Sequence, residues 1–121
     1  MPAPKTRLKS PESIAEKMNR RNLRPAVFLD RDGVINVEKG FLSREEDMEL
    51  IEGAAEGVAR INAAGWLAIV VTNQPVIARG DCSWEELGRI NARMETLLGR
   101  GHAFLNDIIT VSADYIINIG L

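Results

Sequence analysis

Residues that build disulfide frameworks and zinc sites are almost absent from this sequence. Its 121 residues include a single cysteine, Cys82, and a single histidine, His102. One cysteine cannot form an internal disulfide bond, and these two residues cannot supply the four ligands of a structural zinc site. We therefore expect a cytoplasmic protein with neither a disulfide framework nor a structural zinc ion of its own.

Long apolar runs are absent as well. No run approaches the roughly 20 residues that a transmembrane helix needs, and the N-terminus lacks the apolar core of a signal peptide. Residues 1–24 carry seven basic and two acidic side chains, a net charge of +5, and no aromatic residue. Because aromatic side chains that stack on bases are missing there, we interpret 1–24 as a basic helical lead-in. We expect no membrane partner, and a nucleic-acid-binding module is the weakest alternative.

One stretch dominates what is present. Ala26–Leu29 is a continuous apolar run that leads directly into Asp30, Arg31, Asp32 and Gly33. Such a run, ended by a turn signal, is typical of a buried parallel strand. Ligands of open parallel sheets bind beyond the carboxyl ends of the strands. Alternate side chains of an extended chain point the same way, so Asp30 and Asp32 can share one site.

Two carboxylates at one place repel each other, and a bound cation offsets that repulsion. Hard oxygen ligands of this kind suit Mg²⁺. One carboxylate can then attack a phosphorus atom while its neighbour handles a proton. The alternative is that Asp30 and Asp32 only form a turn after the strand, where acidic residues are common.

A second apolar run, Trp66–Val71, also ends in polar residues, Thr72-Asn73-Gln74. The helical spacing of apolar residues from 54 to Gly65 predicts a helix between the two runs. A strand–helix–strand crossover places both strand ends at one edge of a parallel sheet. The hydroxyl and amide groups after the second strand would then lie near Asp30 and bind phosphate oxygens, unless they form only a β-turn.

The remaining patterns complete one α/β domain over 25–121. Ser10 and Pro11 predict the start of a short helix that runs to about residue 22. Capping boxes begin at Ser43, before a single turn, and at Ser83, before an amphipathic helix. We expect a loop over 76–81 and a third strand over 107–111.

The segment 34–41 is expected to form a loop beside the site. Loops at such a position often carry function. Glu38, Lys39 and Phe41 either contact a substrate there or lie on plain surface.

Three motifs, Asp30–Asn36, Val71–Gln74 and Ile77–Gly80, together resemble the haloacid dehalogenase (HAD) superfamily. More narrowly, they are similar to its heptose 1,7-bisphosphate phosphatases and to the related histidinol-phosphate phosphatases. The similarity covers most of the chain, from about residue 24 to 111. It implies a partial HAD-like Rossmannoid fold of class α/β, with three parallel strands, flanking helices and the later strands missing.

The resemblance also implies a hydrolase that converts a sugar phosphate, heptose 1,7-bisphosphate, to heptose 1-phosphate. Asp30 would be the nucleophile that forms an aspartyl-phosphate, and Asp32 the general acid and base. Both would hold Mg²⁺, Asp32 through its backbone carbonyl, and Thr72 would bind the transferring phosphoryl group. The substrate site would be lined by Arg31, Glu38, Lys39, Gly40, Phe41, Asn73, Gln74 and Arg79.

Three departures from the family pattern matter. Relatives have serine and glycine where this chain has Pro75 and Val76, and Ser112–Asp114 stands in place of their zinc loop. No lysine or arginine follows Arg100, although the family uses a later cation and later carboxylates. We therefore expect no zinc site, an incomplete magnesium site and weak or absent activity of a C-terminally truncated chain. The alternative is a non-catalytic fragment that binds a phosphosugar or a partner chain.

Without the later strands, Ala26–Leu29 would be an uncharged edge of the sheet. Such an edge invites pairing with another chain. We expect self-association or a complementing second half at this edge, unless the strand-prone Tyr115–Ile119 folds back over it.

Overall fold

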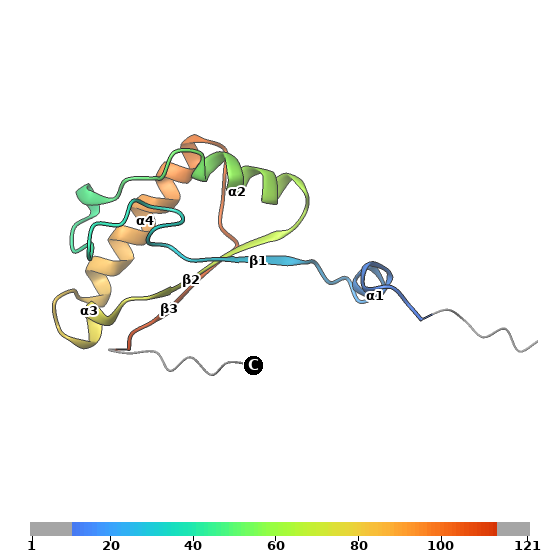
Figure 1. Ribbon diagram of the computed structural model, residues 1–121, viewed down its shortest axis with the longest axis horizontal. Helices are drawn as coiled ribbons and strands as arrows, with labels where there is room; N and C mark the ends of the chain where they lie inside the picture. Colours follow the sequence, from blue (N-terminus) through green and yellow to red (C-terminus); the bar gives the residue numbers. More distant parts are fainter. Residues whose placement is uncertain (1–10, 114–121) are drawn as a thin grey trace, which may run out of the picture.

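Three parallel strands form the centre of the computed structural model, which describes residues 11–113. The strands are β1 (Ala26–Leu29), β2 (Leu67–Asn73) and β3 (Asp107–Val111), in the order β1-β2-β3 (Figure 1). Their parallel pairing brings all three carboxyl ends to one edge of the sheet. The predicted three-stranded parallel arrangement is confirmed.

β2 continues two residues beyond the apolar run that predicted it. Thr72 and Asn73 pair with Thr110 and Val111 of β3, so the polar residues extend the strand rather than form a turn. Thr72 is buried on the same side as Ala68. The pairing with β3 therefore fixes where the polar end of β2 points.

Two helices, α2 (Ala54–Ala63) and α4 (Trp84–Arg100), cover one face of the sheet (Figure 1). The inward side of α4 supplies much of the core, because Ile90, Met94 and Leu98 are completely buried. Their spacing of four residues is the apolar stripe of an amphipathic helix. Helix α4 begins at the predicted cap, where the Ser83 hydroxyl accepts a hydrogen bond from the Glu86 amide.

The predicted boundaries of two short elements are wrong. Helix α1 (Ile14–Arg20) is capped by Ser13, whose hydroxyl and backbone exchange hydrogen bonds with Glu16, so it does not begin at Ser10. The 3₁₀ turn η1 (Glu45–Asp47) is preceded by Arg44 and has no side-chain cap, so the capping box at Ser43 does not form.

A further short helix, α3 (Pro75–Ala78), occupies part of the segment predicted as a loop. Proline is well tolerated in the first turn of a helix because its missing N–H needs no partner there. The motif Ile77–Gly80 thus follows β2 as one helical turn and not as irregular loop.

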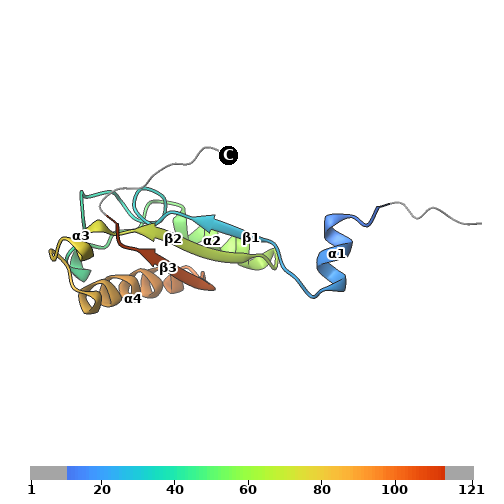
Figure 2. The same cartoon turned by 90° about the horizontal axis from the view of Figure 1, so that it is seen from below.

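The other face of the sheet has no helix over it in the described part of the chain (Figure 2). The strand register places Phe28 beside Ile69, and Val71 beside Ile109, on this face. Phe28 is 64% exposed and Ile109 is 43% exposed. Parallel sheets are usually buried on both sides, so this apolar surface, called the open face below, is an unusual feature.

The segments 1–10 and 114–121 lie outside the described residues. The prediction that Tyr115–Ile119 covers the sheet edge concerns residues in the second of these segments. Residues 1–10 of the predicted basic lead-in 1–24 belong to the first. None of the helices within 11–113 is long and apolar enough to cross a membrane.

The end of α4 packs closely on the start of α2, which gives a test of the fold. A Cβ atom added at Gly101 would lie 2.7 Å from the Ala55 Cβ, whereas one at Gly99 would meet nothing within 4 Å. We predict that Gly101→Ala lowers the free energy of unfolding by about 1–3 kcal/mol through overpacking.

Gly99→Ala is the matched control, because it removes a glycine from the last turns of the same helix without a clash. It should leave stability unchanged or raise it by up to about 1 kcal/mol. Urea unfolding measures both variants, and equal effects of the two substitutions would contradict the packing described.

Candidate functional site

A cleft of about 380 Å³ lies at the carboxyl ends of β1 and β2. Segments from the loop after β1, the end of β2 and helix α3 form its walls. Every predicted site residue except Lys39 lines it. The lining residues are Asp30, Arg31, Asp32, Glu38, Gly40, Phe41, Thr72, Asn73, Gln74, Pro75, Val76 and Arg79.

Asp30, the first residue after β1, is exposed at the cleft. Its carboxylate makes no hydrogen bond or ion pair with another residue within 11–113. Both oxygens are therefore open to a ligand. A carboxylate in this state can coordinate a cation or act as a nucleophile.

The Asp32 carboxylate, unlike that of Asp30, accepts hydrogen bonds from N–H donors of three side chains. Its Oδ1 accepts from Arg31 Nη2 at 3.1 Å and from Asn36 Nδ2 at 3.0 Å. Its Oδ2 accepts from Gln74 Nε2 at 2.8 Å. Two neighbouring carboxylates thus have different environments, one open and one fixed.

These contacts decide the charge of Asp32. Burial raises the pKa of its carboxyl, but the hydrogen bond from Asn36, the charge of Arg31 and the hydrogen bonds from Gln74 and Arg31 together outweigh burial. The net result is a pKa below the usual value for aspartate. Asp32 is therefore an anion at neutral pH.

Arg31 is completely buried, although it was predicted to bind substrate. Besides Asp32, its guanidinium donates to Asn91 Oδ1 on α4 at 3.2 Å. Arg31 therefore donates hydrogen bonds to Asp32 on one side and to Asn91 on the other.

Gln74 links the two strand ends. The same Nε2 atom that donates to Asp32 also lies 2.8 Å from the Thr72 hydroxyl. Thr72 and Gln74 are both buried. The Thr72 hydroxyl accepts from Gln74, so its own hydrogen is free to be donated to a ligand oxygen.

Asn73 is engaged with the backbone. Its side chain donates to the Ala113 carbonyl and accepts from the Ala113 amide, both at 3.1 Å. This pair of bonds ties the end of β2 to the chain after β3. The predicted contact of Asn73 with phosphate would have to compete with them.

The loop after β1 contributes unevenly to the cleft. Glu38, Gly40 and Phe41 line it, and Phe41 is 52% exposed. Lys39 lies outside the lining, and its amine contacts the Asp47 carbonyl and the Glu49 carboxylate. The loop therefore offers an acidic and an aromatic side chain to a ligand, and its lysine is directed to the neighbouring segment.

The donor atoms of this cleft fit Mg²⁺ in part. The open Asp30 carboxylate is a hard oxygen ligand, whereas the Asp32 oxygens are already occupied by N–H donors. No group of three or more acidic, histidine or cysteine side chains suited to a metal occurs among residues 11–113. Mg²⁺ commonly binds one or two carboxylates together with waters and substrate phosphate, and the cleft meets that smaller requirement.

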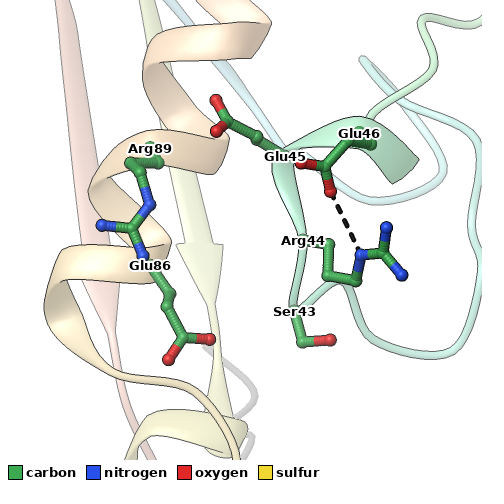
Figure 3. A pocket seen from close by; sticks show the side chains of 6 residues that line it. All are labelled: Ser43, Arg44, Glu45, Glu46, Glu86 and Arg89. Atoms are coloured by element: carbon green, nitrogen blue, oxygen red, sulfur yellow. Dashed lines mark hydrogen bonds and ion pairs between the residues drawn. The ribbon is translucent and has the colours of Figure 1, made fainter.

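A second hollow lies between η1 and α4 and shares no lining residue with the cleft (Figure 3). Acidic and basic side chains alternate around it, and Arg44 pairs with Glu46 at 3.1 Å. Such exposed pairs contribute little energy and bind water well. We assign no chemistry to this hollow.

Sequence reasoning missed two residues that shape the site. Asn36 belongs to the motif after β1, and its membership of that motif was the available signal. Asn91 lies 60 positions from Arg31, half-buried on α4 between the buried Leu87 and Met94, so its one local signal was a polar residue within the apolar stripe.

No family model matches the chain. It is, however, 41% identical over 91 residues to the D-glycero-D-manno-heptose-1,7-bisphosphate 7-phosphatase of Thermosynechococcus vestitus, a match that covers 75% of this chain and 46% of the relative. It is 53% identical over 62 residues to the D-glycero-beta-D-manno-heptose-1,7-bisphosphate 7-phosphatase of Vibrio cholerae, which covers 51% of this chain and 33% of that one. The chain therefore spans about half or less of the length of these relatives.

Solved structures agree with the sequence relatives. A D,D-heptose 1,7-bisphosphate phosphatase from B. bronchiseptica, complexed with magnesium and phosphate, superposes with a TM-score of 0.70 at 26% identity, over 74% of this chain and 51% of that one. A putative HAD-like phosphatase from Mesorhizobium loti superposes with a TM-score of 0.71 at 36% identity, over 74% and 43%. The chain is therefore similar to the HAD-like phosphatases in sequence and in fold, and its named relatives are heptose-1,7-bisphosphate phosphatases.

Proposed function

We propose that this chain carries the nucleophile and the proton-transfer residue of a phosphomonoesterase that acts on a sugar phosphate. The observation that carries the proposal is the unequal pair at the end of β1. Asp30 is exposed and without a partner in the described residues, while Asp32 is fixed beside it. The Thr72 hydroxyl lies in the same cleft and suits a phosphoryl oxygen.

In the first step, an Asp30 oxygen attacks phosphorus and the bond from phosphorus to the sugar oxygen breaks. The sugar oxygen leaves with a proton from Asp32, and an aspartyl-phosphate remains on Asp30. Thr72 donates a hydrogen bond to a phosphoryl oxygen. Positioning and charge stabilisation supply most of the rate enhancement in such a transfer.

In the second step, Asp32 removes a proton from water, whose oxygen attacks the phosphorus. The bond from phosphorus to Asp30 breaks, and inorganic phosphate leaves. The lowered pKa of Asp32 keeps the carboxylate in the deprotonated form that a base needs, and it also makes that carboxylate a weaker proton acceptor. Its role as an acid requires a higher pKa, and the negative charge of an entering phosphate shifts the pKa in that direction.

Asp30 and the backbone carbonyl of Asp32 would hold Mg²⁺, which when bound neutralises charge on the phosphoryl oxygens. A relative's structure contains magnesium and phosphate together, which supports this choice of metal. The proposed substrate is heptose 1,7-bisphosphate, because that sugar appears in the names of the relatives. Histidinol phosphate is the alternative substrate, and a cytoplasmic location stays a prediction.

We predict that Asp30→Asn abolishes magnesium-dependent phosphate release from heptose 1,7-bisphosphate, because an amide is a far poorer nucleophile. Turnover of the purified 121-residue chain should already be slow, since the described residues offer few metal ligands. Asp107→Asn is the matched control, because Asp107 is an exposed carboxylate at the opposite end of the sheet.

Phosphate release is followed with a colorimetric assay at several enzyme concentrations. Equal turnover by the parent and Asp30→Asn would refute the role of Asp30. Binding of the sugar bisphosphate with no turnover by either protein would favour the non-catalytic alternative instead.

We further propose that a second copy of the chain associates with the open face and the edge of β1. The face is apolar, and β1 contains no charge or proline that would discourage pairing. Three strands of 4, 7 and 5 residues, about 4.8 Å apart, give a footprint of roughly 240 Å². A stable interface needs about 800 Å² from each partner, so this association is weak and concentration-dependent.

Light scattering between micromolar and millimolar concentrations tests this proposal. The apparent mass of the parent should rise with concentration, and Phe28→Glu should suppress the rise by placing a charge on the open face. Trp84→Glu is the control, because Trp84 is 59% exposed at the start of α4, on the helical side. A parent that stays monomeric at all concentrations contradicts the proposal and leaves a complementing second polypeptide as the partner to test.

A further inference from the structure

Arg31 is the one residue of the Asp30–Gly33 motif whose side chain is completely buried. A charged group without access to water needs protein partners for its N–H groups. Arg31 has two such partners, Asp32 on one side and Asn91 on the other. Its position between them links the site loop to helix α4.

Asn91 is held firmly enough to serve as an anchor. It follows Ile90 and precedes Met94 on α4, and both of these side chains are completely buried in the core. The backbone of Asn91 is therefore fixed by packing. Its Oδ1 accepts the Arg31 Nη1 hydrogen at 3.2 Å, which restricts the guanidinium to the orientation in which Nη2 reaches Asp32.

We infer that Asn91 is a positioning residue: by orienting Arg31, it keeps the Asp32 carboxylate in the one orientation that also contacts Asn36 and Gln74. This assignment gives Arg31 an orienting role in place of the substrate contact predicted from the sequence. Its consequence for catalysis rests on the proposed function, whereas its consequence for the Asp32 side chain does not.

A purely structural role for Asn91 predicts something different. In that case, loss of the amide lowers stability and leaves Asp32 unaffected. Asn62 provides the comparison, because its side chain also makes two hydrogen bonds, both to the Phe104 backbone. Asn62 lies on α2 and contributes nothing to the cleft lining.

The test measures the side-chain rotamer of Asp32 by three-bond nitrogen–carbon couplings in the isotopically labelled 121-residue chain. The parent should show the coupling of a single χ1 rotamer. Asn91→Ala should move it to a value averaged over rotamers, because the guanidinium loses its anchor. Asn91→Asp should keep the parent value, since a carboxylate also accepts from Arg31, and Asn62→Ala should keep it despite its loss of stability.

An unchanged Asp32 coupling in a folded Asn91→Ala chain would overturn the inference, and so would an equal change in Asn62→Ala. If Asn91→Ala does not fold, Arg31→Lys replaces it: lysine lacks the rigid fork whose two terminal nitrogens contact Asp32 and Asn91 separately, so the coupling should again become averaged. A parent value retained in Arg31→Lys would overturn the inference equally.

If the parent hydrolyses a sugar phosphate, the kcat and KM of the variants provide a second test. The Asn91→Ala variant should lose roughly ten- to a hundredfold in kcat with little change in KM, as expected for misplacement of a reacting group, and Asn91→Asp should recover most of it. The rotamer measurement decides the role of Asn91 even where the parent shows no turnover, so failure of this inference is distinguished from failure of the proposed function.

Discussion

The stabilisation of one charged carboxylate organises this site. Asp32 is partly buried at the end of β1, where burial alone would favour its protonated form. Arg31, Asn36 and Gln74 reverse that preference by directing N–H donors at both of its oxygens. These donors come from the site loop and from the end of β2, so the same contacts that keep the charge also hold two strand ends together. Asp30, by contrast, is exposed and makes no hydrogen bond or ion pair with another described residue.

The wider fold serves to bring those donors together. Parallel pairing of β1 with β2 aligns their carboxyl ends, and Gln74 then reaches across to Asp32. Helix α4 packs beneath with completely buried side chains, so a polar residue on its surface can anchor the buried Arg31. The other side of the sheet lacks such support in the described residues. The site is therefore supported by packed side chains on the side of the helices, and the open face lies on the opposite side of the sheet.

Much of the fold followed from local patterns, because continuous apolar runs and a capped amphipathic helix specify their own elements. The third strand, 107–111, was predicted with its observed bounds. Helix starts at Ser10 and Ser43 were wrong, since competing caps or tertiary contacts decided those positions. In the site, the alternation of Asp30 and Asp32 predicted a shared location but not their different environments. Those depend on partners up to 60 positions away, which no local pattern encodes.

Asp32 is a stabilising anion in the folded chain. A carboxyl with a lowered folded-state pKa contributes stability that is complete above its unfolded pKa, near 3.9, and is lost as the pH falls through the folded pKa. The most direct measurement is the free energy of unfolding of the parent and of Asp32→Asn between pH 7 and pH 3. We expect the parent to be the more stable protein at pH 7 and the difference to shrink below about pH 4. A difference that stays constant over this range, or grows towards acid, would contradict it.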